Sequence, residues 1–122
     1  ATPKVTASDG TIAREAAATL GFAARVERTA RQLIQVGVVP PLVNLLRRGI
    51  AENPGVDTPE VLVPMHAAAI LAVRSIGSHV YGQESLAEAG ALAALRTLAA
   101  RSPNAAVRAA ALSCSTDVFD DF

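Results

Sequence analysis

Apolar residues recur along most of the chain at the three- and four-residue spacing that places side chains on one face of an α-helix. We expect the leucines of these stripes to be buried between helices, namely Leu42, Leu45, Leu71 and Leu95. Alanine, which favours helices and disfavours strands, forms runs at 16–18 and 67–69. The pattern therefore predicts an all-α protein with helices over about 11–25, 26–36 and 83–89.

Glycine, proline and hydroxyl residues mark where further helices begin and end. Gly37 and Gly90 each follow a predicted helix, at the position where glycine adopts the left-handed cap. A second helix begins directly after each of them. Thr58 and Ser102 each precede a proline, an arrangement typical of a helix N-terminus. Pro64 predicts a separate first turn over 59–63, with the regular helix starting at Pro64 itself.

These signals repeat within the chain. Residues 37–48 align with 90–101 at an offset of 53, and residues 58–63 align with 102–107 at an offset of 44. The change in offset equals a nine-residue insertion, 49–57, which we expect to be an exposed loop without regular structure. A partial third copy precedes both, because Ile12, Ala16 and Leu20 repeat the spacing of Val63, Ala67 and Leu71.

Each unit has three helices and is a little over forty residues long without the insertion. Residues 37–46, with the pattern Gly-x-x-Pro-x-Leu-Val-x-Leu-Leu, open the second helix, and such a unit resembles the armadillo repeat. The resemblance covers about residues 11–118. It implies a right-handed α-solenoid in which the whole chain, 1–122, is one domain and a fragment of a longer array. The units would be a partial repeat ending in a third helix over 8–25, a repeat over 26–79 with the insertion 49–57, and a repeat over 80–122.

The resemblance also implies where a partner would bind, because third helices line the concave groove of an armadillo solenoid. In the nuclear-import branch of the family, each third helix carries a Trp and an Asn that hold an extended peptide. This chain has neither residue type at those positions, so the nuclear-import function is in doubt. The corresponding groove positions are Ala18, Ala69 and Ser113 for Trp, and Phe22, Val73 and Asp117 for Asn, with His66 expected to be exposed on the same face.

Two functions fit such a module. The first is a non-catalytic protein-interaction scaffold that binds a peptide or a partner helix in the groove of third helices, which here is small and apolar. The alternative is a structural or assembly module that packs against neighbouring domains or against copies of itself. The family has diverse partners, so the resemblance does not choose between these two functions.

Composition narrows the class of protein and the cellular location that we expect. Hydrophobic residues make up 51% of the chain and charged residues 18%, which favours a folded core over disorder. The formal net charge is zero, which argues against binding nucleic acid through phosphate contacts. The longest uncharged apolar stretch, 61–73, has 13 residues and predicts no membrane span. A single cysteine excludes an internal disulfide, and we expect a cytoplasmic protein, with a nuclear one as the other possibility.

The charges are unevenly distributed. Residues 1–50 carry a net charge of +4 and residues 51–122 a net charge of −4. The simpler interpretation is ordinary surface charge. The functional one is a basic patch made by Arg25, Arg28 and Arg31, which would meet an acidic partner or the acidic segment 117–121 of another copy. Such a contact would give weak, head-to-tail self-association.

Residues that could bind a metal ion or catalyse a reaction are few and scattered. His66 and His79 lie thirteen residues apart, and Cys114 is the only cysteine, so no metal-binding spacing is present. Gly77 and Gly82 have the spacing of a phosphate-binding loop but lack the following Lys-Ser/Thr. No nucleophile motif accompanies them. We expect no catalytic residue, no metal site and no cofactor.

Overall fold

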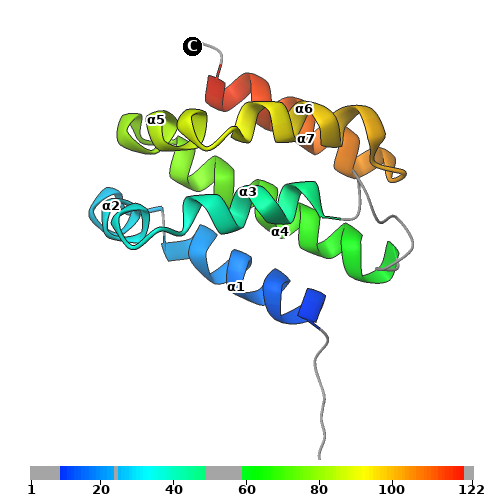
Figure 1. Cartoon of the computed structure of the whole chain (residues 1–122), viewed down its shortest axis with the longest axis horizontal. Coiled ribbons are helices and arrows are strands. Elements are labelled where there is room, and N and C mark those ends of the chain that lie inside the picture. Colours follow the sequence, from blue (N-terminus) through cyan, green and yellow to red (C-terminus); the bar gives the residue numbers. More distant parts are fainter. Residues whose placement is uncertain (1–8, 24, 49–58, 120–122) are drawn as a thin grey trace, which may run out of the picture.

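The computed structural model describes residues 9–23, 25–48 and 59–119, and the regular structure in these ranges is entirely helical (Figure 1). The all-α class is therefore confirmed for the described part of the chain. The predicted loop 49–57 lies outside the described residues. The helices are α1 (Asp9–Ala23), α2 (Glu27–Gln35), α3 (Val39–Arg47), α4 (Pro59–Gly77), α5 (Val80–Glu88), α6 (Ala91–Arg101) and α7 (Ala105–Phe119).

The helices form three layers that follow the order of the sequence (Figure 1). We call α1 the lower layer, α2, α3 and α4 the middle layer, and α5, α6 and α7 the upper layer. Helices that the internal repeat makes equivalent touch from one layer to the next. Thus α2 contacts α5, α3 contacts α6, and α4 contacts both α1 and α7. The hydrophobic core lies between these layers and also within them, where α3 packs on α4 and α6 on α7.

The two predicted glycine caps are confirmed. Gly37 has a φ of 88° and Gly90 a φ of 83°, both in the left-handed region. After α2, the N–H of Gly37 donates to the carbonyl of Ile34 and the N–H of Val38 to that of Leu33. This pair of bonds is the Schellman arrangement, which satisfies the last carbonyls of the helix while the chain reverses direction. The cap therefore sets the angle at which α3 leaves α2.

Small residues bring α1 and α4 close together. Ala17 on α1 and Ala69 and Ala72 on α4 are fully buried. A Cβ on Gly21 would lie 3.0 Å from the Cα of Ala72, so the two backbones leave no room for a side chain there. Alanine and glycine thus replace the aromatic residues that usually fill a helical core, since close approach itself supplies the packing contacts.

The predicted leucine core is confirmed only in part. Leu42 and Leu95 are buried, and Leu45 is half-buried. Leu71 is 60% exposed, so the prediction that it is buried is wrong. The reason is that α4 is the central helix and packs against α1, α3, α5 and α7, which leaves a narrow exposed stripe that contains Leu71.

Two predicted helix starts need correction. Pro64 lies inside the continuous helix α4, not at its beginning. Only the carbonyl of Glu60, an exposed residue four positions earlier in the first turn, loses its helical partner, so the proline is tolerated there. Likewise α7 begins at Ala105, because Asn104 rather than Ser102 caps it: the Oδ1 of Asn104 accepts the N–H of Val107 at 3.0 Å.

Candidate functional site

The third helices of the predicted units, α1, α4 and α7, lie side by side and carry the candidate groove residues. Ala18, Ser113 and Asp117 are exposed, as a binding surface requires. Ala69 and Val73 are completely buried, so neither side chain can line an open groove. The side chain of Phe22 lies outside the described part of the structure. The groove inferred from the resemblance is therefore wrong for α4.

The exposed side of α4 is a different stripe. Ala67 and Leu71 are exposed and Arg74 is half-exposed, at positions i, i+4 and i+7. Such a spacing places the three side chains on one helix face. The spacing is visible in the sequence, but the spacing alone is equally compatible with a buried helix face. Only the contacts of α4 with both α1 and α7 show that this stripe faces solvent.

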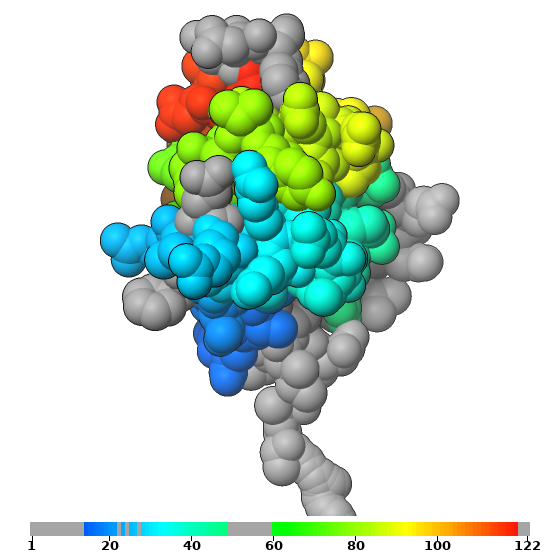
Figure 2. Space-filling view, turned by 90° about the vertical axis from the view of Figure 1, so that its left-hand side faces the viewer, coloured from blue at the N-terminus to red at the C-terminus, as the bar shows by residue number. Residues whose placement is uncertain are grey.

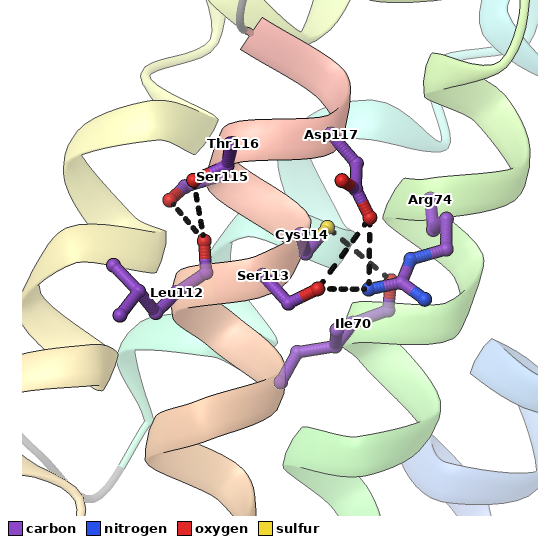
Figure 3. Close-up of polar contacts among 8 residues, drawn as sticks. All are labelled: Ile70, Arg74, Leu112, Ser113, Cys114, Ser115, Thr116 and Asp117. Atoms are coloured by element: carbon purple, nitrogen blue, oxygen red, sulfur yellow. Dashed lines mark hydrogen bonds and ion pairs between the residues drawn. The ribbon is translucent and has the colours of Figure 1, made fainter.

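Polar side chains gather where this stripe meets α7 (Figure 3). The Nη2 of Arg74 donates to the Oγ of Ser113 at 3.5 Å and lies 3.7 Å from the Oδ2 of Asp117. The hydroxyl of Ser113 donates to the same carboxylate oxygen at 3.4 Å. Because Arg74 and Asp117 are 43% and 59% exposed, this ion pair contributes little to stability. Its importance is that it presents both charges and a hydroxyl on one surface.

Cys114 lies directly beneath this cluster and is buried. Burial raises the pKa of its thiol, an effect that nearby Arg74 offsets only partly and Asp117 reinforces. The sulfur lies 3.9 Å from the carbonyl oxygen of Ile70, to which the thiol donates (Figure 3). A protonated, buried thiol is a poor nucleophile, so Cys114 acts as a small core residue at the α4–α7 contact.

His66 belongs to the core and not to the groove. It is only 2% exposed, so the expectation of an exposed histidine is wrong. Its Nε2 lies 2.9 Å from the carbonyl oxygen of Arg48, which can only accept, so this nitrogen carries the proton. The bond satisfies a carbonyl that follows the last turn of α3. His66 therefore ties the end of α3 to α4.

The residues of the predicted basic patch lie on α2 or just before it, and Figure 2 shows the face of the molecule where α2 and α5 stack. Arg25, Arg28 and Arg31 are all exposed. The guanidinium of Arg31 lies 5.4 Å from the ring centre of Tyr81, at the distance of a cation–π contact. Arg31 and Tyr81 also line a shallow polar hollow of about 420 Å³ together with His79. The structure thus places Arg31 of the predicted patch beside the start of α5.

Within the described residues, no three His, Cys, Asp or Glu side chains gather in a way that could hold a metal ion. One helical stretch, Glu60–Gly77 of α4, is long and apolar enough to cross a membrane by length and composition, and 56% of it is buried inside the fold. The central helix of a folded core meets the same criteria, so this stretch is weak evidence for a membrane span.

Comparison of the chain with protein-family models, with curated proteins and with solved structures found no match.

Proposed function

We propose that this chain forms an armadillo-type α-solenoid that serves as a non-catalytic protein-interaction scaffold. The stacking of equivalent helices from layer to layer supports this architecture, as do the glycine caps that separate the first and second helix of each unit. In a solenoid, each unit buries its core only against its neighbours, and the third helices together make one continuous surface. That surface would bind the partner.

The observation that carries this proposal is the exposed stripe of α4 beside the polar cluster on α7. Leu71 is a large apolar side chain that is 60% exposed, and Arg74 and Asp117 lie next along the same surface. An apolar anchor rimmed by groups that donate and accept hydrogen bonds is the usual composition of a protein-binding surface. The partner would be a peptide or helix that places an apolar side chain against Leu71 and polar groups against the Arg74–Asp117 pair.

Site-specific photo-crosslinking would test this surface. A photoreactive phenylalanine at position 71 should give discrete protein adducts in an extract of the source cells, and these should be lost when Arg74→Glu is added. Val80 is the matched control, because it is 72% exposed and apolar but lies at the start of α5. The same adducts from both positions, or adducts at position 71 that persist with Arg74→Glu, would contradict the proposed surface.

A further inference from the structure

A second apolar surface lies between α1 and α3. It is a groove of about 320 Å³. Figure 1 shows α1 at the lower end of the molecule, below α3. The groove is lined from α1 by Ala16 and Leu20, and from the start and body of α3 by Val38, Pro41 and Leu45. Within the described chain, the lower layer holds α1 alone, whereas each layer above it holds three helices.

The internal repeat provides a covered copy of the α3 side of this groove. The residues 53 positions after Val38, Pro41 and Leu45 are Ala91, Ala94 and Leu98 on α6. These three counterparts are between 0% and 2% exposed. In the lower copy, Val38 and Leu45 are half-buried and Pro41 is exposed. This difference in exposure has one cause. The residues of α6 are covered by α3, whereas no described helix covers the corresponding side of α3.

The side of α3 that turns toward α6 shows what a covering helix needs. Val39, Val43 and Leu46 are buried at positions i, i+4 and i+7. Arg47 follows at i+8, and its Nη2 lies 3.0 Å from where a Cβ on Gly90 would stand. Gly90 follows the C-cap residue Ala89 of α5, and the last carbonyls of α5 carry partial negative charge. As the helix that covers α6, α3 thus contributes a stripe of aliphatic side chains together with one cation, Arg47, which lies near the C-terminal end of α5.

The corresponding position in the middle layer is open. Gly37 follows α2 as Gly90 follows α5, and a Cβ on Gly37 would meet no atom within 4 Å. We infer that the groove between α1 and α3 binds a helix of a partner protein with aliphatic residues at i, i+4 and i+7 and a basic residue at i+8. The stripe lies against Val38, Pro41 and Leu45, and the basic side chain lies at Gly37 over the C-terminal end of α2.

A second copy of this chain does not meet that specification. The residues of α6 that correspond to Val39, Val43 and Leu46 are Leu92, Arg96 and Ala99. Arg96 is exposed and occupies the central position of the stripe. Docking α6 into the groove of another copy would bury this guanidinium among apolar side chains, which is unfavourable without a paired acid. The face that α6 of a second copy would present thus carries a charge that the groove does not pair, and the occupant is a different helix.

The test uses the whole chain and a synthetic peptide of about 20 residues, since shorter helices are marginal in water. The peptide carries Val, Val, Leu and Arg at i, i+4, i+7 and i+8 in an Ala-, Glu- and Lys-rich helix. Fluorescence anisotropy should show saturable binding. Changing the peptide's i+4 residue to Asp should weaken binding about tenfold or more. Changing its i+8 Arg to Glu should weaken it about two- to fivefold, an effect reduced by salt.

Variants of the chain locate the site. Pro41→Glu adds a carboxylate to an exposed residue in the first turn of α3, where an acid favours the helix. It should weaken peptide binding about tenfold, as should Ala16→Glu on the opposite wall. Ala93→Glu is the matched control in the first turn of α6, and it should leave binding unchanged. Binding equal in wild type and Pro41→Glu, or equal binding of a scrambled peptide, would overturn the proposal. So would a dimer of the chain disrupted by Pro41→Glu and by Arg96→Glu alike.

Discussion

The middle and upper layers are two copies of one sequence pattern in two different surroundings. Gly90 at the start of α6 has the guanidinium of Arg47 against it, whereas Gly37 before α3 faces open space. Leu98 is fully buried, whereas its counterpart Leu45 is half-buried. The sequence pattern decides which face of each helix is apolar. The neighbouring layer decides whether that face is covered, so in this molecule burial depends on position in the stack.

The largest difference in stability is expected between alanine substitutions of these two leucines. Leu98→Ala should lower the free energy of unfolding by about 2–5 kcal/mol, because it leaves a cavity in a fully packed site. Leu45→Ala should cost only about 1–2 kcal/mol, since part of that side chain already contacts solvent. Urea denaturation followed by circular dichroism measures both. Equal losses for the two variants would show that the groove beside Leu45 is closed in solution.

Alanine substitutions at the two glycine caps should lower stability by more similar amounts. Both glycines have a positive φ, so an alanine at either position is strained by about 1–2 kcal/mol. Gly90→Ala should cost slightly more than Gly37→Ala, because the new methyl group displaces the side chain of Arg47. Thermal melts of the two variants test this ranking. A neutral Gly37→Ala would mean that the cap after α2 is not left-handed in solution.

The start of α7 offers a smaller effect. Asn104→Ala removes the side-chain oxygen that accepts the N–H of Val107, which should cost about 1 kcal/mol. Asn104→Asp keeps an acceptor and adds a charge that favours the helix N-terminus, so it should restore wild-type stability. Chemical denaturation of the pair provides the comparison. If Asp proved as damaging as Ala, the cap at Asn104 would be refuted.

The contact between α4 and α7 should make stability depend on pH through Cys114. Burial raises the pKa of this thiol, so the folded chain keeps a proton that the unfolded chain releases. The resulting stability is complete below the unfolded pKa of about 8.5 and is lost as pH rises through the folded pKa. Cys114→Ala should therefore lose less stability than wild type between neutral and alkaline pH. Parallel curves for the two proteins would exclude this effect.

Local signals in the sequence were sufficient for the helices and their glycine caps, since a left-handed residue after an apolar stripe depends on a few neighbouring residues. The groove residues were harder to predict. Ala69 and Leu71 both belong to apolar spacings, and only the packing of α4 between α1 and α7 buries the first and exposes the second. The start of α7 was missed for a local reason, because Asn104 competes with Ser102 as a cap and accepts the better-placed N–H.

Amide hydrogen exchange tests most directly the claim that equivalent helices differ because only one of them is covered. We expect the amide of Leu98 to exchange only through global unfolding, and the amide of Leu45 to exchange at least about tenfold faster through local opening beside the groove. Equal protection of Leu45 and Leu98 in the whole chain would mean that α3 is as well covered as α6, and that the two layers do not differ in their surroundings.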